Sequence, residues 1–321
     1  MLRDEMITVF GGSGFLGRHV VRALAKAGYR VRVATRRPHL SQDLRVMGVV
    51  GQVQLVQANV RVPSSVERAV AGASGVVNLV GVLAESGRQS FSGLHAMGAK
   101  TIAEACAAAG IDKLVQVSAI GASAESDSKY AQSKAAGEAH VIAAVPGATI
   151  LRPSIIFGTD DGFFNMFGSM ARFAPALPLF GGGKSLFQPV FAGDVASAVL
   201  AAYQRDEARG AIYELGGPAT YSFKQLMEFI LKETARPRFL IPLPFAAGQV
   251  VAMLSELAAI LPFIPSFLTQ DQLKQLRKDN VVSEGAKTLA DLGIEGETVE
   301  AIVPGYLARY RRYGQFHENE A

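Results

Sequence analysis

Short apolar runs alternate with longer stretches of helical period over the first half of the chain. The strand-like runs cover residues 6–10, 30–35, 54–57, 75–80, 113–118 and 148–151. Helical stretches lie between them at residues 16–27, 64–71, 91–109 and 130–145. Because the strands of a parallel sheet are buried on both faces, they read as continuous apolar runs. The order therefore predicts an α/β fold, a doubly wound parallel sheet with helices on both faces.

A glycine-rich turn joins the first predicted strand to the first predicted helix. Its glycines Gly11, Gly14 and Gly17 form a G-x-x-G-x-x-G pattern that also contains Phe15 and Leu16. Glycines permit a tight turn and let backbone N–H groups approach a pyrophosphate, and the positive end of the helix dipole then faces the anion. Strand, turn and helix together indicate a dinucleotide site of the Rossmann kind.

The alternation of predicted strands and helices ends after Arg152 and Pro153. Loops rich in Gly, Pro and Phe follow, with helical stretches at residues 163–172, 194–205 and 222–233. We therefore expect a dinucleotide-binding Rossmann core over residues 1–152. Residues 153–321 should form a smaller C-terminal substrate or cap region, with some segments returning to the core.

Composition and charge limit the classes of ligand and partner that we expect. Apolar residues make up 49% of the 321 residues and charged residues 19%, as in a compact globular protein. The net charge is +4, and residues 1–37 carry eight Lys or Arg against two acids, which suits a phosphate-rich small ligand. No basic segment is interleaved with aromatic residues, so we expect no nucleic-acid partner. The five histidines show no metal-ligand spacing, so no metal site is predicted.

Cysteine usage and the first residues bear on the compartment. The single cysteine, Cys106, cannot form an internal disulfide, which fits a reducing compartment. It falls in an Ala-rich helical stretch and is expected to be plain core. No signal peptide is visible, because charged residues 3–5 are followed at once by the first strand.

One segment, from Phe239 to Leu268, is unusually apolar. Prolines at positions 242, 244, 262 and 265 bracket a predicted helix of about 17 residues, fewer than the roughly 20 that span a bilayer. The segment could lie on a membrane surface, on a partner protein or over a substrate cleft. Packing against its own domain is the alternative, and the sequence leaves the two open.

Two arginines indicate which dinucleotide is bound. Arg36 and Arg37 follow the second strand about 20 residues after the glycine turn, where an NAD site would place an acidic residue on the ribose hydroxyls. Arginines at this position can hold a 2′-phosphate and stack on adenine. NADP(H) is therefore the predicted cofactor, with NAD(H) the less favoured one. Two weaker signals concern the rest of the nucleotide: Asn59 and Val60 are expected near the adenine, and Asn78 near the ribose. They are weaker because an Asn after a strand usually serves to form a turn.

A set of three residues carries possible redox chemistry. Ser118 ends the fifth strand, and Tyr130 and Lys134 are four residues apart at the start of a helix, so the latter two share one face. The ammonium of Lys134 is expected to lower the pKa of the Tyr130 phenol from its usual value near 10. Ser118 would hydrogen-bond a substrate oxygen while hydride passes to or from the nicotinamide. The set fits carbonyl reduction or alcohol oxidation. Tyr130 and Lys134, and Pro153 further along the chain, are also expected to contact the cofactor.

These motifs resemble the short-chain dehydrogenase/reductase superfamily, in its extended or atypical branch. More narrowly, the chain is similar to the nucleotide-binding accessory subunits of respiratory complex I and their bacterial relatives. The matching pieces are residues 9–17, Tyr130 with Lys134, residues 151–158, 188–190 with 194–196, and 273–282. They span nearly the whole chain. At one place the chain departs from many superfamily enzymes, which carry an Asn where residues 95–99 read His-Ala-Met-Gly-Ala, and this leaves a proton relay there open.

The resemblance implies a tightly held NADPH with a structural role and association with membrane respiratory or quinone-related machinery. Partners would be respiratory complex I or a quinone-biosynthesis assembly, with a membrane surface contacted through the segment from Phe239 to Leu268. The expected location is cytoplasmic or matrix-side, peripheral on the inner membrane. The alternative is an active NADPH-dependent oxidoreductase that uses Ser118, Tyr130 and Lys134 on an apolar carbonyl or quinone-related substrate.

Overall fold

The computed structural model describes residues 2–87, 89–258 and 268–316. It divides into two compact units. Unit 1 consists of residues 1–153, 192–215 and 282–295, and unit 2 of residues 154–191, 216–281 and 296–321. Both units are built from discontinuous stretches of chain.

Unit 1 contains a seven-stranded sheet in the order β11-β6-β5-β4-β1-β2-β3, and all neighbouring strands are parallel. The strands are β1 (Met6–Phe10), β2 (Arg30–Thr35), β3 (Val53–Gln57), β4 (Gly75–Asn78), β5 (Leu114–Val117), β6 (Thr149–Pro153) and β11 (Ile212–Leu215). The strand order reverses between β1 and β4, which is the point where ligands bind to doubly wound sheets. The predicted fold class is confirmed.

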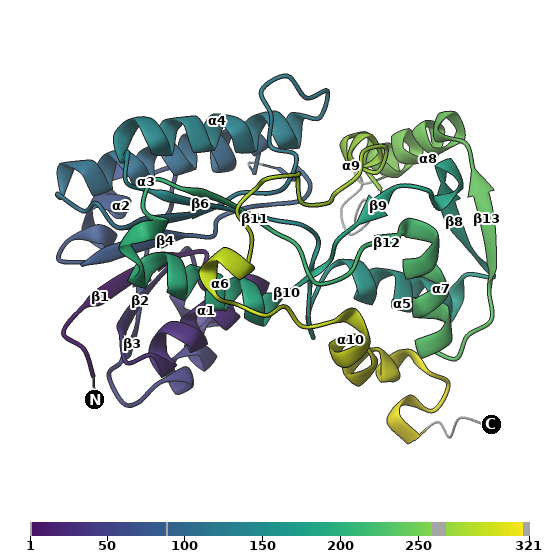
Figure 1. Cartoon of the computed structure of the whole chain (residues 1–321), viewed down its shortest axis with the longest axis horizontal. Helices are drawn as coiled ribbons and strands as arrows, with labels where there is room; N and C mark the ends of the chain where they lie inside the picture. Colours follow the sequence, from purple (N-terminus) through teal and green to yellow (C-terminus); the bar gives the residue numbers. More distant parts are fainter. Residues whose placement is uncertain (1, 88, 259–267, 317–321) are drawn as a thin grey trace. The chain divides into compact units, whose positions relative to one another are not determined.

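Helices cover both faces of this sheet (Figure 1). Helices α1 (Phe15–Lys26) and α6 (Ala192–Gln204) pack together on one face. On the other face lie α2 (Pro63–Val70), α3 (Met97–Ala108) and α4 (Lys129–Ala144), each packed on the next. The predicted helix over residues 91–109 differs in one respect, because its first part, Ser92–Ala96, is a π-helical turn that leads into α3.

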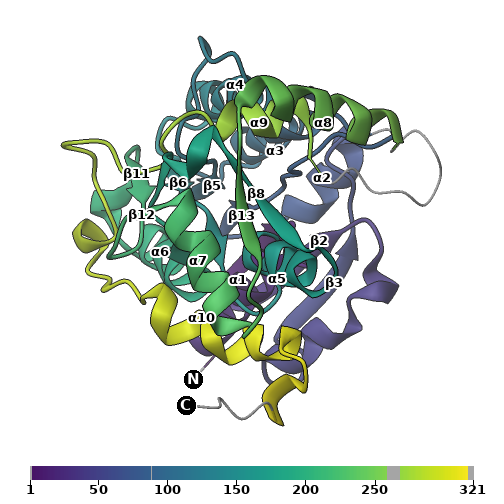
Figure 2. The same ribbon diagram turned by 90° about the vertical axis from the view of Figure 1, so that its right-hand side faces the viewer.

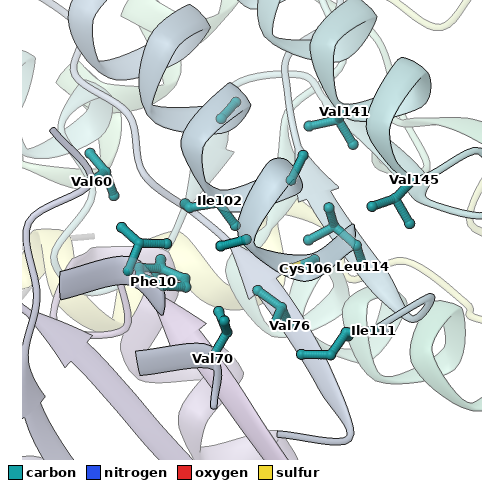
Figure 3. Close-up of a cluster of buried hydrophobic side chains, with 14 of the residues drawn as sticks. Phe10, Val60, Val70, Val76, Ile102, Cys106, Ile111, Leu114, Val141 and Val145 are labelled. Atoms are coloured by element: carbon teal, nitrogen blue, oxygen red, sulfur yellow. The ribbon is translucent and has the colours of Figure 1, made fainter. Parts of the chain in front are cut away.

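One buried core cluster of unit 1 lies between the sheet and helices α2, α3 and α4 (Figure 3). Strand residues such as Phe10 and Val76 meet Ile102 of α3 and Val141 of α4, and all four are at most 1% exposed. Cys106 is fully buried in this cluster, and burial raises the pKa of its thiol to about 12. Its predicted role as plain core is confirmed.

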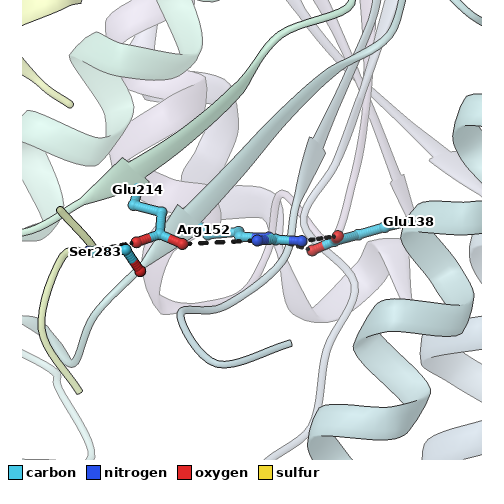
Figure 4. A network of polar contacts seen from close by, with 4 residues as sticks. All are labelled: Glu138, Arg152, Glu214 and Ser283. Carbon is cyan, nitrogen blue, oxygen red and sulfur yellow. Dashed lines mark hydrogen bonds and ion pairs between the residues drawn. The ribbon is translucent and has the colours of Figure 1, made fainter. Parts of the chain in front are cut away.

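A buried ion network ties α4 to two strands of the sheet (Figure 4). Arg152 of β6 donates from Nε and Nη2 to the two carboxylate oxygens of Glu138 on α4, over 3.0 and 2.6 Å. Its Nη1 lies 3.6 Å from Glu214 of β11, which also accepts the Ser283 backbone N–H over 2.8 Å. The strand β11 was not predicted from the sequence.

Unit 2 combines helices with three two-stranded sheets (Figure 2). The strand pairs are β7 (Ile156–Phe157) with β10 (Val190–Phe191), β9 (Leu186–Phe187) with β12 (Tyr221–Ser222), and β8 (Ala176–Phe180) with β13 (Phe239–Leu243). The helices are α5 (Phe163–Phe173), α7 (Phe223–Glu233), α8 (Phe245–Ala258), α9 (Gln270–Gln275) and α10 (Val299–Leu307). Their apolar faces share a core rich in phenylalanine, in which Phe163, Phe167 and Phe223 meet edge to face.

The apolar segment from Phe239 to Leu268 is not helical from its start. Residues Phe239–Leu243 form β13, which pairs with β8, and the helix α8 begins after Pro244. Proline is tolerated in β13 because the strand lies at the edge of its two-stranded sheet. The remainder of the segment, residues 259–267, lies outside the described residues. Among the helices that the structure describes, none is both long and apolar enough to cross a bilayer.

Candidate functional site

The glycine turn lies at the carboxyl end of β1, next to β4. Gly11 has a left-handed φ of 79°, and a Cβ there would lie 3.0 Å from the Leu79 carbonyl carbon and 3.1 Å from the Val80 nitrogen. At Gly17 a Cβ would lie 2.2 Å from the Gly11 carbonyl oxygen. Side chains at either position would force the backbone apart, so these two glycines let the strand, the turn and the helix close on one another.

The N-terminus of α1 offers backbone donors to an anion. Gly14 is its N-cap residue and supplies no side-chain cap, and the first turn holds no acidic residue. The first hydrogen bond within the helix runs from the Arg18 N–H to the Gly14 carbonyl. The N–H groups of Phe15, Leu16 and Gly17 therefore have no acceptor within the helix and form its N-terminal end. These N–H groups carry no side-chain cap, and the glycines place no side chain between them and a bound anion. Both features fit the binding of a pyrophosphate.

The arginines predicted for the adenosine end follow β2. Arg36 and Arg37 are both exposed, and Thr35 just before them lies 3.2 Å, Oγ to Oγ, from Ser13 of the glycine turn. Asn59 and Val60 follow β3, the neighbour of β2. The Asn59 side chain accepts the Arg61 N–H, and Val60 is buried. The structure thus places these residues at the carboxyl ends of adjacent strands.

Two other predicted site residues are engaged within the sheet. Asn78, at the end of β4, is 1% exposed, donates to Gln116 Oε1 over 2.7 Å and accepts the Val80 N–H over 3.0 Å. Its amide therefore shapes the turn after β4. Pro153 ends β6 and accepts the Ile120 N–H at its carbonyl over 3.0 Å.

The structure brings Ser118 and Lys134 together at the end of β5. The Nζ of Lys134 lies 3.5 Å from the carbonyl oxygen of Val117, the residue before Ser118. It also lies 5.8 Å from the centroid of the Tyr130 ring, over its face. Ser118 is 4% exposed, and its Oγ has no hydrogen-bond partner among the described residues. Since a buried hydroxyl without a partner is costly, this atom fits a ligand oxygen.

A fourth residue of this group, His95, is absent from the set predicted from sequence. It lies in the π-helical turn before α3, and its ring packs edge-on to Tyr130 with centroids 5.3 Å apart. Nε2 accepts the Val82 N–H over 3.0 Å, while Nδ1 lies 2.9 Å from Ser133 Oγ. Ser133 donates its own proton to the Tyr130 carbonyl, so Nδ1 carries the histidine proton. The signal in the sequence was the departure from the superfamily pattern at this position.

Burial sets the protonation of the group. It lowers the pKa of His95 to about 3 and that of Lys134 to about 8, although the charge of Glu138 acts to raise the latter. It raises the pKa of Tyr130 to about 12. The expectation that Lys134 lowers the Tyr130 pKa is therefore wrong, because desolvation of the phenolate outweighs the ammonium above the ring. At neutral pH the phenol keeps its proton and can donate it to an oxygen.

The model of the NAD dependent epimerase/dehydratase family matches residues 7–216, about two thirds of the chain. The chain belongs to this family. The resemblance to the extended short-chain dehydrogenase/reductases is thereby confirmed, and NAD(P) is the cofactor class of the family and of its solved neighbours.

More closely, the chain is similar to a mitochondrial respiratory subunit. It is 36% identical to NADH dehydrogenase (ubiquinone) 1 alpha subcomplex subunit 9 of Arabidopsis thaliana, over 96% of this chain and 78% of that protein. The subunit of the same name from Mus musculus is 33% identical over 95% and 80%. Among solved structures, an NADPH-dependent quinone oxidoreductase of Escherichia coli complexed with NADPH superposes with a TM-score of 0.73 at 18% identity, covering 94% of this chain and 99% of that one.

Proposed function

We propose that this chain is an NADP(H)-binding accessory subunit of the respiratory complex I type, in which the nucleotide stabilises the fold. The observation that carries the proposal is the similarity to subunit 9 over nearly the whole chain, across both units and not only the nucleotide-binding one. A ligand present at a free concentration of a hundred times its dissociation constant adds about 2.7 kcal/mol to the free energy of unfolding. A nucleotide that is never turned over can therefore stabilise the protein.

NADP(H) is the form we propose to be bound. The support is the pair of exposed guanidinium groups, Arg36 and Arg37, directly after β2, with no acidic residue beside them in the sequence. A guanidinium offers bidentate donors to a 2′-phosphate and a flat face to adenine, whereas an NAD site needs an acceptor for the ribose hydroxyls.

The proposed setting is peripheral, on the cytoplasmic or matrix side of an inner membrane. The partner would be respiratory complex I, as the relatives' names indicate, or a quinone-biosynthesis assembly. The described part of the apolar segment supports a surface role, because α8 exposes Val250, Met253, Leu254 and Leu257 by more than half of their areas.

A second candidate function is an active NADPH-dependent oxidoreductase on an apolar carbonyl or quinone-related substrate. The buried Ser118 Oγ favours this function, because it makes no hydrogen bond to a described residue and could bind a ligand oxygen beside Lys134 and Tyr130. The nicotinamide would supply the hydride. Tyr130 would donate its proton to the substrate oxygen, Ser118 would orient that oxygen, and Lys134 would stabilise the charge that develops on the phenol.

The deciding experiment is to purify the protein without added nucleotide, denature it and identify what it releases by mass spectrometry and absorbance. Near-stoichiometric NADPH that exchanges slowly with free nucleotide supports the structural function. An empty protein that binds NADPH rapidly and reversibly supports the oxidoreductase, since a cosubstrate must leave after every turnover.

A matched pair of variants separates the two functions further. Tyr130→Phe removes the proton donor and keeps the ring that packs against His95. An oxidoreductase should lose nearly all turnover in Tyr130→Phe and retain its NADPH affinity. A structural subunit should keep the same nucleotide content, melting temperature and incorporation into its assembly in this variant as in the native chain.

A further inference from the structure

Four arginines from three separate segments of unit 2 gather in one place, which we call the arginine cluster: Arg172, Arg236, Arg238 and Arg312. Arg238 Nε donates to the Ala171 carbonyl over 2.9 Å, and Arg236 Nε donates to the Tyr310 carbonyl over 2.8 Å. These bonds fix the end of α5, the link before β13 and the turns after α10 side by side, as Figure 2 shows for the same three segments.

The positive charge of the cluster is not neutralised within the part of the chain that the structure describes. No carboxylate there lies within ion-pair distance of the four guanidinium groups, and the nearby Glu233 is paired with Arg311. Burial, and then the charges of Arg238, Arg172 and Arg312, lower the pKa of Arg236. Guanidinium groups gathered without a counter-charge among the described residues attract anions to this surface.

Large aromatic side chains stand out around the cluster. Phe173 and Phe239 directly follow Arg172 and Arg238 and are each 80% exposed, and Tyr313 directly follows Arg312 and is 62% exposed. The guanidinium of Arg172 lies over the Phe173 ring at 5.3 Å, and that of Arg312 over the Tyr313 ring at 5.5 Å. Aromatic rings beside cationic groups are the side chains favoured at the level of lipid headgroups.

The two elements that follow Arg238 in the chain, β13 and α8, expose large apolar side chains. Phe239 and Ile241 are two residues apart on one face of β13 and are both exposed. In α8 the buried positions are few, with Ala252 at 0% exposure. Its exposed large apolar residues are Val250, Val251, Met253, Leu254 and Leu257. Exposed apolar side chains gathered on two consecutive elements indicate an interaction site.

We propose that the arginine cluster, the aromatic side chains around it and the exposed faces of β13 and α8 dock unit 2 on a membrane of anionic phospholipids. The arginines bind headgroup phosphates through charge-assisted, bidentate hydrogen bonds. The aromatic rings and α8 enter the boundary of the acyl chains. The apolar faces favour a lipid surface over a nucleic acid, which offers nothing for α8 to contact. This inference deepens the proposed peripheral location by naming the lipid class.

The test is co-sedimentation of the full chain with vesicles of phosphatidylcholine alone and of phosphatidylcholine with 30% phosphatidylglycerol. We expect strong binding to the anionic vesicles, weakened by salt. The variant Arg172→Glu/Arg312→Glu should bind them at least about thirtyfold more weakly, because each of the two basic residues lost contributes on the order of 1 kcal/mol near the surface. Its control is Arg45→Glu/Arg68→Glu, the same charge change at exposed positions of unit 1, which should bind like the native chain.

Several results would overturn the proposal: equal binding to both vesicles, no binding to either, or equal weakening in the control pair. A variant Leu254→Gln tests the apolar face, and it should weaken binding in a manner that salt does not change. Each variant is checked for a native melting temperature and NADPH content. A chain that contains NADPH but does not bind vesicles contradicts the lipid proposal alone. A chain that binds anionic vesicles but contains no NADPH contradicts the nucleotide proposal alone.

Discussion

Arg152 holds Glu138 through two parallel hydrogen bonds, a bidentate pair that joins the middle of α4 to β6 (Figure 4). The Glu138 side chain is 6% exposed, and it stands one helical turn from Lys134, whose charge it favours. The pair therefore fixes the helix that carries Tyr130 and Lys134 and also sets part of the electrostatic environment of Lys134.

Glu138→Gln should lower the free energy of unfolding by about 2–4 kcal/mol, because it leaves a half-buried guanidinium with Glu214 as its remaining partner. Denaturant unfolding at pH 7 measures the change. The control is Asp112→Asn, which breaks the ion pair with Arg209 at the surface and should cost less than about 1 kcal/mol. Equal losses in both variants would show that burial of the Arg152 pair has no special weight.

His95 should make stability fall in mild acid. Its pKa is lowered from 6.5 to about 3 in the folded chain, so the unfolded chain binds the extra proton and stability is lost as the pH drops below about 6.5. Between pH 7.5 and pH 5 this group should cost about 2 kcal/mol. Urea unfolding of His95→Gln should show a pH dependence smaller by that amount.

The exposed His39 supplies the control for this measurement. His39→Gln makes the same substitution at an exposed position and serves as the matched control. If His95→Gln and the native chain fall in parallel from pH 7.5 to pH 5, the buried imidazole is not the source of the acid sensitivity.

Two glycines of the turn should respond differently to alanine. At Gly17 the new Cβ would lie 2.2 Å from the Gly11 carbonyl oxygen, so Gly17→Ala should lower the melting temperature and weaken NADPH binding tenfold or more. At Gly14 the nearest atom would be 3.3 Å away, so Gly14→Ala should fold normally and lose affinity only by crowding the phosphate. Fluorescence titration and thermal unfolding measure both, with Gly305→Ala, which meets nothing within 4 Å, as the control.

Arg36→Ala tests the choice between the two dinucleotides. The variant should lower the ratio of NADPH to NADH affinity by about tenfold to a hundredfold, the value of one or two hydrogen bonds to a charged group. Arg30→Ala, at the opposite end of the same strand, should leave the ratio unchanged. An unchanged ratio in Arg36→Ala as well would contradict the assignment of the 2′-phosphate site.

Much of unit 1 could be predicted because its strands are continuous apolar runs and its turn needs glycine. The strand Ile212–Leu215 was missed, since four residues that include Glu214 carry no such run, and the partner that buries Glu214 is Arg152, distant in sequence. In the apolar segment, the strand Phe239–Leu243 was also missed, because its partner β8 is distant in sequence and Pro242 interrupts the strand-like run.

The site was predicted in its residue types and not in its electrostatics. Tyr130 and Lys134 were found from their spacing, but the pKa of Tyr130 depends on how completely the fold desolvates the phenol, which no spacing reveals. The place of His95 depends on the π-helical turn, which shifts the register of side chains by a fraction of a turn. The sequence carries no distinct signature for such a turn.

The chain leaves unit 1 after Pro153 and returns for α6 and β11, then leaves again and returns for residues 282–295. During synthesis, β6 emerges from the ribosome long before its edge partner β11, and the Lys287 carbonyl that accepts the Glu214 N–H emerges later still. During translation the nucleotide-binding sheet therefore has an open edge at β6 while the first segment of unit 2, residues 154–191, is made. A gene fragment that stops at residue 152 would encode a sheet that can never close this edge.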